Sequence, residues 1–191
     1  MESANVFTAA PTPESVGIPS RAVLNLLQRI DSERICVHGF LLVRHNRIAA
    51  EGYWAPWSAD RKHRMYSVSK SFASLGVGLM IDEGKLSLDD RVADYFPDKL
   101  PEKLHPWVAA CTVRDLLRMS TAHSSTSYGS RDPDWVWTFF NKTPSHPPGT
   151  IFAYDTAATV VLTATVERLA GKPLLDGLVG VPCTVLRGRY L

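Results

Sequence analysis

A serine and a lysine three residues apart have the types and the spacing of a nucleophile and its base. Ser67 and Lys70 occur in the run MYSVSKSF, which spans residues 65–72. On a helix, positions i and i+3 share one face, so the Lys70 amine would reach the Ser67 hydroxyl. The N-terminus of that helix would supply N–H groups and positive potential that stabilise an alkoxide or an oxyanion. A lysine in an apolar pocket also loses its proton more readily, because desolvation disfavours the ammonium. The pair therefore predicts nucleophilic acyl chemistry.

The spacing alone also has a structural interpretation. A serine that caps a helix, followed by a surface lysine, gives the same pattern, and a chain of 191 residues yields about one such pattern by chance. The surrounding elements must therefore decide. The run from Ser67 to Glu83 is strongly apolar nearly all round and is followed by Gly84, so it predicts a buried central helix that ends at a glycine.

The elements before this helix predict a small β-rich part. Residues 1–19 are rich in proline and small polar residues and predict an extended arm. Ser20 is a suitable N-cap for a helix over 21–33, whose apolar stripe consists of Val23, Leu26, Leu27 and Ile30. Residues 35–44 and 47–54 predict an antiparallel hairpin with a turn at His45-Asn46. Two strands alone are marginal, so the hairpin needs further partners.

The rest of the chain predicts helices and long loops. We expect short helices over 91–96, 112–119, 134–141, 157–170 and 173–179, with polar loops at 121–134 and 143–150. The chain therefore belongs to the α+β class, with a helical region and part of an antiparallel sheet. The resulting organisation is an N-terminal arm, a domain portion over 20–178 and an atypical tail over 179–191.

Composition narrows the function class. The chain is 45% hydrophobic and 21% charged with a net charge of +2, which excludes a disordered chain and argues against a nucleic-acid partner. Neither a signal peptide nor a membrane span is expected, since no apolar run is long enough. Cys36, Cys111 and Cys183 are odd in number and lack CxxC spacing, which indicates reduced thiols and a cytoplasmic location. The histidine spacing predicts neither a metal site nor a cofactor.

Several segments in a fixed order carry a family resemblance. Besides the run at 65–72, these are DEGKLSLDD at 82–90, YFP at 95–97, TVRDLLRMS at 112–120 and PGTIFAY at 148–154. Together they resemble the serine β-lactamase and penicillin-binding-protein superfamily, most of all the branch of class C β-lactamases, DD-peptidases and β-lactamase-like esterases. The resemblance implies a β-lactamase/transpeptidase-like fold and an acyl-enzyme mechanism on a small-molecule ester or amide.

The resemblance also implies roles for further residues. Tyr154 would sit beside Ser67 and, held near Lys70, carry the proton between the nucleophile and the leaving group. Thr156 stands where the family's Tyr-x-Asn motif has asparagine; it keeps a hydroxyl but lacks the amide that contacts substrate. Trp135 and His123 lie in segments that would border the site and are candidate substrate contacts, with loop anchoring and solvation as the alternatives.

The resemblance covers the first half or so of a family member and stops near Leu178. The family's third motif, a Lys-Thr-Gly or His-x-Gly equivalent on a late strand, has no counterpart after Tyr154. We therefore expect a truncated or frame-shifted product that lacks the late sheet strands. The alternatives to a serine hydrolase are a catalytically inactive truncated relative, acting as a ligand-binding or remnant module, and a helical interaction module outside the family. An open sheet edge also predicts self-association.

Overall fold

The computed structural model describes residues 7–126 and 132–178. The chain divides into two compact units, Met1–Arg64 and Met65–Leu191, and each is described by itself. The predicted tail at 179–191 and the middle of the predicted loop at 121–134 lie outside the described residues. No helix in the described part of the chain combines the length and the apolar composition that crossing a bilayer requires.

The first unit contains the predicted hairpin. Strands β2 (Gly39–Arg44) and β3 (Arg47–Tyr53) pair antiparallel, which confirms the hairpin, with a bulge between Leu42 and Val43. His45 and Asn46 form the two-residue turn, and both have positive φ angles, of 51° and 59°. That backbone is typical of a type I′ turn, whose twist matches the twist of the strands.

The expected extended arm is partly structured. Strand β1 (Thr8–Ala9) pairs parallel with β3, which makes a three-stranded sheet in the order β1-β3-β2. A one-turn 3₁₀ helix, η1 (Pro13–Val16), follows it. The sequence did not indicate these two elements, because a two-residue strand carries no periodicity that a sequence pattern can reveal. Among the described residues, the outer edge of β2 pairs with no further strand.

Helix α1 (Ser20–Ser32) begins one residue earlier than expected. Pro19 is its N-cap, and the Ser20 N–H donates to Glu14 Oε1 at 2.6 Å, so the prediction of Ser20 as the cap is wrong. The Glu14 carboxylate, which lies in η1, takes the capping role because it accepts the Ser20 N–H, which has no partner within the helix. Leu26 is 44% exposed, so the predicted apolar stripe is narrower than expected.

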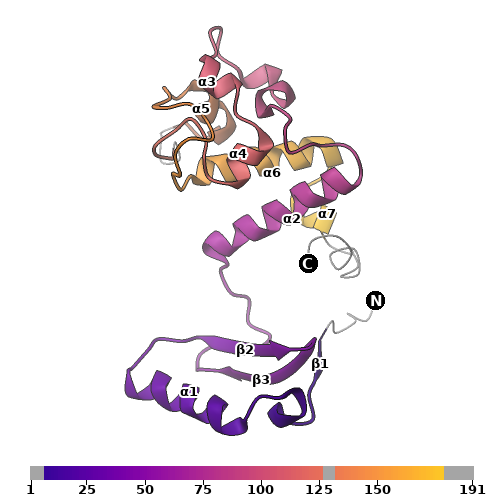
Figure 1. Ribbon diagram of the computed structural model, residues 1–191, viewed down its shortest axis with the longest axis vertical. Coiled ribbons are helices and arrows are strands. Elements are labelled where there is room, and N and C mark those ends of the chain that lie inside the picture. The colour runs from indigo at the N-terminus through magenta and orange to yellow at the C-terminus, as the bar shows by residue number, and fades with distance from the viewer. Residues whose placement is uncertain (1–6, 127–131, 179–191) are drawn as a thin grey trace. The chain divides into compact units, whose positions relative to one another are not determined.

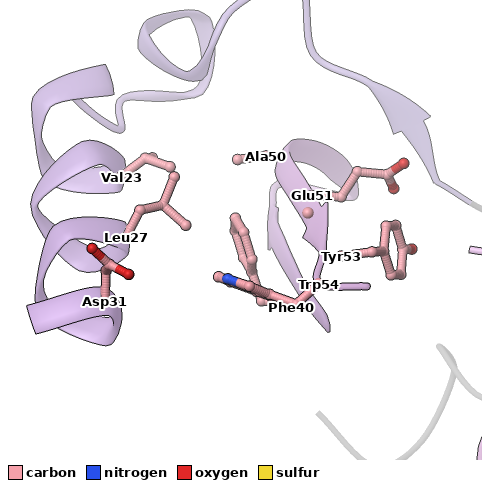
Figure 2. A pocket seen from close by; sticks show the side chains of 9 residues that line it. Val23, Leu27, Asp31, Phe40, Ala50, Glu51, Tyr53 and Trp54 are labelled. Atoms are coloured by element: carbon pink, nitrogen blue, oxygen red, sulfur yellow. The ribbon is translucent and has the colours of Figure 1, made fainter. Parts of the chain in front are cut away.

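A groove of about 460 Å³ separates α1 from the sheet. Val23 and Leu27 face it from the helix, and Phe40, Ala50 and Trp54 face it from the strands (Figure 2). The apolar surfaces of helix and sheet therefore oppose each other without filling the space between them.

The second unit is built around two packed helices, α2 (Ser69–Asp82) and α6 (Thr156–Ala170) (Figure 1). Helix α2 buries a stripe that consists of Ala73, Gly76, Val77 and Met80. A Cβ on Gly76 would lie 2.5 Å from Leu174 Cδ1 and 3.3 Å from Val166 Cγ1, so a larger residue here would force these side chains to shift. The prediction of burial on nearly all sides is wrong, since Leu75 on the opposite face is 37% exposed and Phe72 beside the stripe is 39% exposed.

Short helices complete the second unit. They are η3 (Val92–Tyr95), η4 (Pro97–Lys99), α3 (Pro106–Ala109), α4 (Val113–Leu117), α5 (Trp135–Asn141) and α7 (Leu174–Leu178). All but η4 and α3 match predicted helices to within two or three residues. The caps explain the agreement: Thr112 and Asp115 form a reciprocal capping box on α4, and Asp134 caps α5. The apolar faces of these helices enclose one core, which includes Val77, Phe96, Leu116, Phe139 and Val161.

Candidate active site

Ser67 lies in the tight turn that leads into α2. The turn is a 3₁₀ helix, η2 (Tyr66–Val68), in which the Val68 N–H donates to Met65 O at 3.0 Å. Tyr66 has a φ of +45°, a left-handed conformation that is costly for a bulky residue. Ser67 therefore precedes the α-helix by two residues, and its exposed side chain is presented by the turn.

Lys70 lies in the first turn of α2 and contacts the serine as predicted. Its Nζ donates a hydrogen bond to Ser67 Oγ at 3.3 Å. The described residues do not enclose this pair in the expected apolar pocket, because Lys70 is only half-buried and Ser67 is exposed. The spacing of three residues is enough to bring amine and hydroxyl together, whereas enclosure depends on segments that lie elsewhere in the chain.

Tyr154 is brought to this place by a paired loop. The segment 145–153 runs beside 119–122, and three backbone N–H groups donate across the pair: Ser145 to Ala122 O at 2.9 Å, Gly149 to Ser120 O at 2.7 Å, and Ala153 to Met119 O at 2.8 Å. These bonds hold the residue before Tyr154 to the end of the α4 segment. The tyrosine is thus positioned by backbone pairing rather than by a helix or strand of its own.

The phenol of Tyr154 joins the serine and the lysine. Hydrogen bonds from the Ser67 hydroxyl and from the Lys70 ammonium, helped by the positive charge of Lys70, lower the pKa of Tyr154 below its usual value of 10.0. The Lys70 Nζ lies 4.8 Å from the centre of the tyrosine ring. Tyr154 is 53% exposed. The three predicted catalytic residues therefore lie close together, in a group that opens to solvent.

The residue after Tyr154 was missed by the sequence analysis. Asp155 is the N-cap of α6, and its Oδ1 accepts the Ala157 N–H at 2.8 Å. The side chain is fully buried, and its Oδ2 has no hydrogen-bond partner among the described residues. An aspartate directly before a predicted helix is itself an N-cap signal, so this role could have been recognised. Thr156 follows as the first residue of α6 and is half-buried.

His123 is placed in the interior. It is 1% exposed, and its Nε2–H donates to Phe139 O at 3.0 Å. Burial lowers the pKa of His123, so the ring is neutral at pH 7. The expectation of a solvated loop histidine is therefore corrected, and a substrate contact by His123 stays a prediction. The reason is that α5 folds back over the loop and covers the imidazole with Phe139, whose ring lies edge-on at 5.0 Å.

Trp135 lies at the first position of α5 and is half-buried, and Trp137 on the same helix is exposed. The role of Trp135 and of Thr156 in binding a substrate stays a prediction. Within 7–126 and 132–178, no group of three histidine, cysteine, aspartate or glutamate side chains is arranged to hold a metal ion.

Comparisons with known proteins identify the family of the chain. The family model described as Beta-lactamase matches residues 29–178. The chain is 28% identical over 171 residues to a 6-aminohexanoate-dimer hydrolase of Paenarthrobacter ureafaciens, covering 81% of this chain and 43% of the relative. The chain therefore spans less than half the length of that curated relative.

Solved structures share the fold. A β-lactamase/D-alanine carboxypeptidase from Pseudomonas syringae aligns with a TM-score of 0.69 at 18% identity, over 88% of this chain and 49% of the other. EstCE1, a hydrolase with promiscuous acyltransferase activity, aligns with a TM-score of 0.62 at 25% identity, over 91% of this chain and 52% of the other. The matched residues 29–178 include Ser67, Lys70 and Tyr154. The chain belongs to the Beta-lactamase family.

Proposed function

We propose that this chain carries the acylation machinery of a serine hydrolase that cleaves small esters or amides. The observation that carries the proposal is the convergence of three side chains, in which Lys70 Nζ donates to Ser67 Oγ at 3.3 Å and lies 4.8 Å from the centre of the Tyr154 ring. A nucleophile beside a phenol that can accept its proton, with a cation next to both, is an arrangement that acyl transfer can use.

Acylation would begin at Ser67. Its Oγ attacks the substrate carbonyl carbon while its proton passes to the Tyr154 phenolate, and the C–O bond forms as the carbonyl becomes an oxyanion. The lowered pKa of Tyr154 favours this step, because more of the phenol is ionised near neutral pH. The adjacent Lys70 ammonium stabilises the phenolate before the transfer.

Breakdown of the tetrahedral intermediate would use the same proton. Tyr154 returns it to the leaving alcohol or amine, the bond to that group breaks, and an acyl-serine remains. A water molecule then attacks the acyl carbon, gives up its proton by the same route and releases the acid, which restores Ser67. The exposed position of Ser67 and Tyr154 gives that water direct access.

The substrate class rests on the relatives. The curated relative is named for hydrolysis of the 6-aminohexanoate dimer, and EstCE1 is described as a hydrolase with acyltransferase activity. Thr156 at the start of α6 lacks the amide of the family's asparagine, which favours an ester or a linear amide over a β-lactam. We therefore propose small linear esters and amides as the substrates.

The test is covalent labelling. The purified chain is incubated with p-nitrophenyl acetate and with a labelled penicillin, and adducts are read by intact mass spectrometry. We expect an acetyl adduct on the wild type, none on Ser67→Ala, and wild-type labelling on the matched control Ser71→Ala, which removes a hydroxyl four residues further along the same segment. Lys70→Ala and Tyr154→Phe should slow labelling by about 10²–10⁴-fold. Folded protein without any adduct would overturn the proposal.

A second function is favoured by the openness of the site. Tyr154 is half-exposed and Ser67 is exposed, so nothing described excludes water from a bound substrate. A relative that binds small amides without cleaving them would show saturable binding of the 6-aminohexanoate dimer in calorimetry, unchanged in Ser67→Ala, together with no adduct in the labelling experiment.

A further inference from the structure

A second group of reactive side chains lies in the first unit. Cys36 and His38 precede β2, and His63 ends the segment that follows β3. Cys36 Sγ lies 4.0 Å from His38 Nε2, and His38 Nδ1 lies 2.6 Å from His63 Nε2. His63 Nδ1 in turn lies 3.2 Å from Arg64 O. A thiol, two imidazoles and a carbonyl thus form one continuous chain of hydrogen-bonding atoms.

The carbonyl at the end of this chain fixes the direction of every bond. A carbonyl oxygen only accepts, so His63 Nδ1 must carry the hydrogen and donate to Arg64 O. In neutral His63 the Nε2 is then bare and accepts from His38 Nδ1–H. Neutral His38 is therefore bare at Nε2, the nitrogen that faces the thiol.

This order of donors and acceptors is that of an activated nucleophile. A base within reach of the nucleophile, itself oriented by a third group, is the general signature of nucleophilic side chains. Trp57 supports the arrangement, since its ring stacks on His38 at 4.5 Å with an interplanar angle of 22° and lies 4.5 Å from the His63 ring. The imidazoles are thus held in place by stacking as well as by hydrogen bonds.

We propose that Cys36 is a thiol-modification site, primed by His38 and His63, that reacts with small disulfides. In the reaction the Cys36 proton passes to His38 Nε2, and the sulfur attacks one sulfur of the disulfide. A new S–S bond forms, the original S–S bond breaks, and the leaving thiolate takes up a proton as a free thiol. The product is a mixed disulfide on Cys36, and no further oxidant is needed.

Cys111 is an internal control for this proposal. It is fully buried in the second unit, its Sγ–H donates to Trp107 O at 3.5 Å, and burial raises the pKa of its thiol to about 12. Cys36, by contrast, is exposed. Two thiols of one chain therefore differ in both access and proton acceptor, and they can be compared in a single sample.

The experiment measures the rate at which each cysteine reacts. The full chain at pH 7 is treated with oxidised glutathione, or with iodoacetamide as a second electrophile, and adducts are quantified on the Cys36 and Cys111 peptides by mass spectrometry. The same reaction is run in urea, where both thiols react as in an unfolded chain. Since a free thiol is only a few per cent thiolate at pH 7, we expect Cys36 to react about tenfold faster folded than unfolded. Cys111 should react only when unfolded.

Variants separate the relay from simple exposure. His38→Asn should reduce the folded rate of Cys36 to the unfolded rate, and His63→Leu should reduce it severalfold because His38 loses its orienting acceptor. His63→Gln should restore part of that loss, since its amide oxygen can accept from His38 Nδ1–H. Circular dichroism establishes that each variant folds. A folded rate equal to or below the unfolded rate in the wild type, or no effect of His38→Asn in a folded chain, would overturn the proposal.

Discussion

The two compact units differ in how completely their apolar residues are buried. In the second unit the buried apolar side chains from Val77 to Val166 form one continuous core. Among the described residues of the first unit, only Val16, Ile30 and Ala49 are buried apolar residues, and a groove remains between α1 and the sheet. Packing energy, which scales with the apolar area removed from water, is therefore concentrated in the second unit.

This difference bears on the candidate active site. Ser67, Lys70 and Tyr154 all belong to the second unit, where α2 and α6 pack on each other and the loop before Tyr154 is held by backbone pairing. The proposed acylating group thus stands on the part of the chain that supplies its own core. The reactive thiol proposed above stands on the less packed unit, where hydrogen bonds and ring stacking replace burial.

The largest expected difference between the units concerns their phenylalanines. Phe139 is fully buried, with its ring edge-on to Phe140 at 5.3 Å, so Phe139→Ala should destabilise the second unit by about 3–5 kcal/mol. Phe40 is half-buried beside the groove, so Phe40→Ala should cost the first unit only about 1 kcal/mol. Amide hydrogen exchange, read separately for each unit, measures both losses. Equal losses would contradict the contrast in packing.

Adding apolar atoms should change the stability of the two units in opposite directions. Ala50→Ile adds apolar atoms toward the space between α1 and the sheet and should stabilise the first unit by about 1 kcal/mol. The matched change Ala157→Ile, at a fully buried position of α6, should destabilise the second unit by about 1–3 kcal/mol through overpacking. Urea unfolding followed by hydrogen exchange distinguishes the two. Destabilisation by Ala50→Ile would show that the groove has no room for the added side chain.

The cap of α6 links stability of the second unit to the site. Asp155→Ala removes the acceptor of the Ala157 N–H and should cost about 1 kcal/mol of stability. The substitution should also slow labelling of Ser67 by about tenfold, since the backbone next to Tyr154 loses its anchor. Asp155→Asn supplies an amide oxygen that can still accept the Ala157 N–H, so it should retain most of the stability and most of the labelling rate. Thermal unfolding and the labelling rate are the measurements. If Asp155→Asn were as impaired as Asp155→Ala, the effect would come from the negative charge of Asp155 and not from its hydrogen bond.

Local signals in the sequence predicted the elements well where they were strong. The turn at His45-Asn46, the capping box at Thr112 and the glycine after α6 each act within a few residues, so a pattern can reveal them. The contact between Ser67 and Lys70 follows from helical spacing in the same way. Tyr154 needed the family resemblance, because 87 residues separate it from Ser67 and backbone pairing brings them together.

The errors concern burial and long-range contacts. The apolar residues on the outer face of α2 indicated a fully buried helix, but burial depends on what packs there, and Phe72 is exposed. His123 was expected at a loop surface, yet α5 covers it. The relay of Cys36, His38 and His63 joins residues 27 positions apart, and their types and spacing alone gave no signal. Sequence patterns thus report what each residue prefers, whereas tertiary contacts decide what it meets.

The smallest expected effect is a pH-dependent one on the surface of the second unit. Arg168 on α6 binds Asp98 with two hydrogen bonds of 2.8 Å, and this pairing lowers the pKa of Asp98. A lowered pKa means that the stabilisation is present above the ordinary pKa near 4 and is lost as the pH falls through the lowered value. Arg168→Met should therefore reduce the unfolding temperature by about 2 °C at pH 7 and by less as the pH approaches 2.

Arg29→Met is the control in the first unit. Arg29 pairs with Glu33 at 2.7 Å one helical turn away, but Arg29 is 75% exposed and the contact is local to α1. Because an exposed pair of this kind contributes only a few tenths of a kcal/mol, its loss should shift the unfolding temperature by less than about 1 °C. Arg168 differs in that its guanidinium also lies 4.5 Å from the centre of the Phe96 ring, so this surface charge contacts a buried residue of the core. If both substitutions had equal effects at pH 7, attachment to a packed core would add nothing to a surface ion pair, and the contrast between the units would be confined to their interiors.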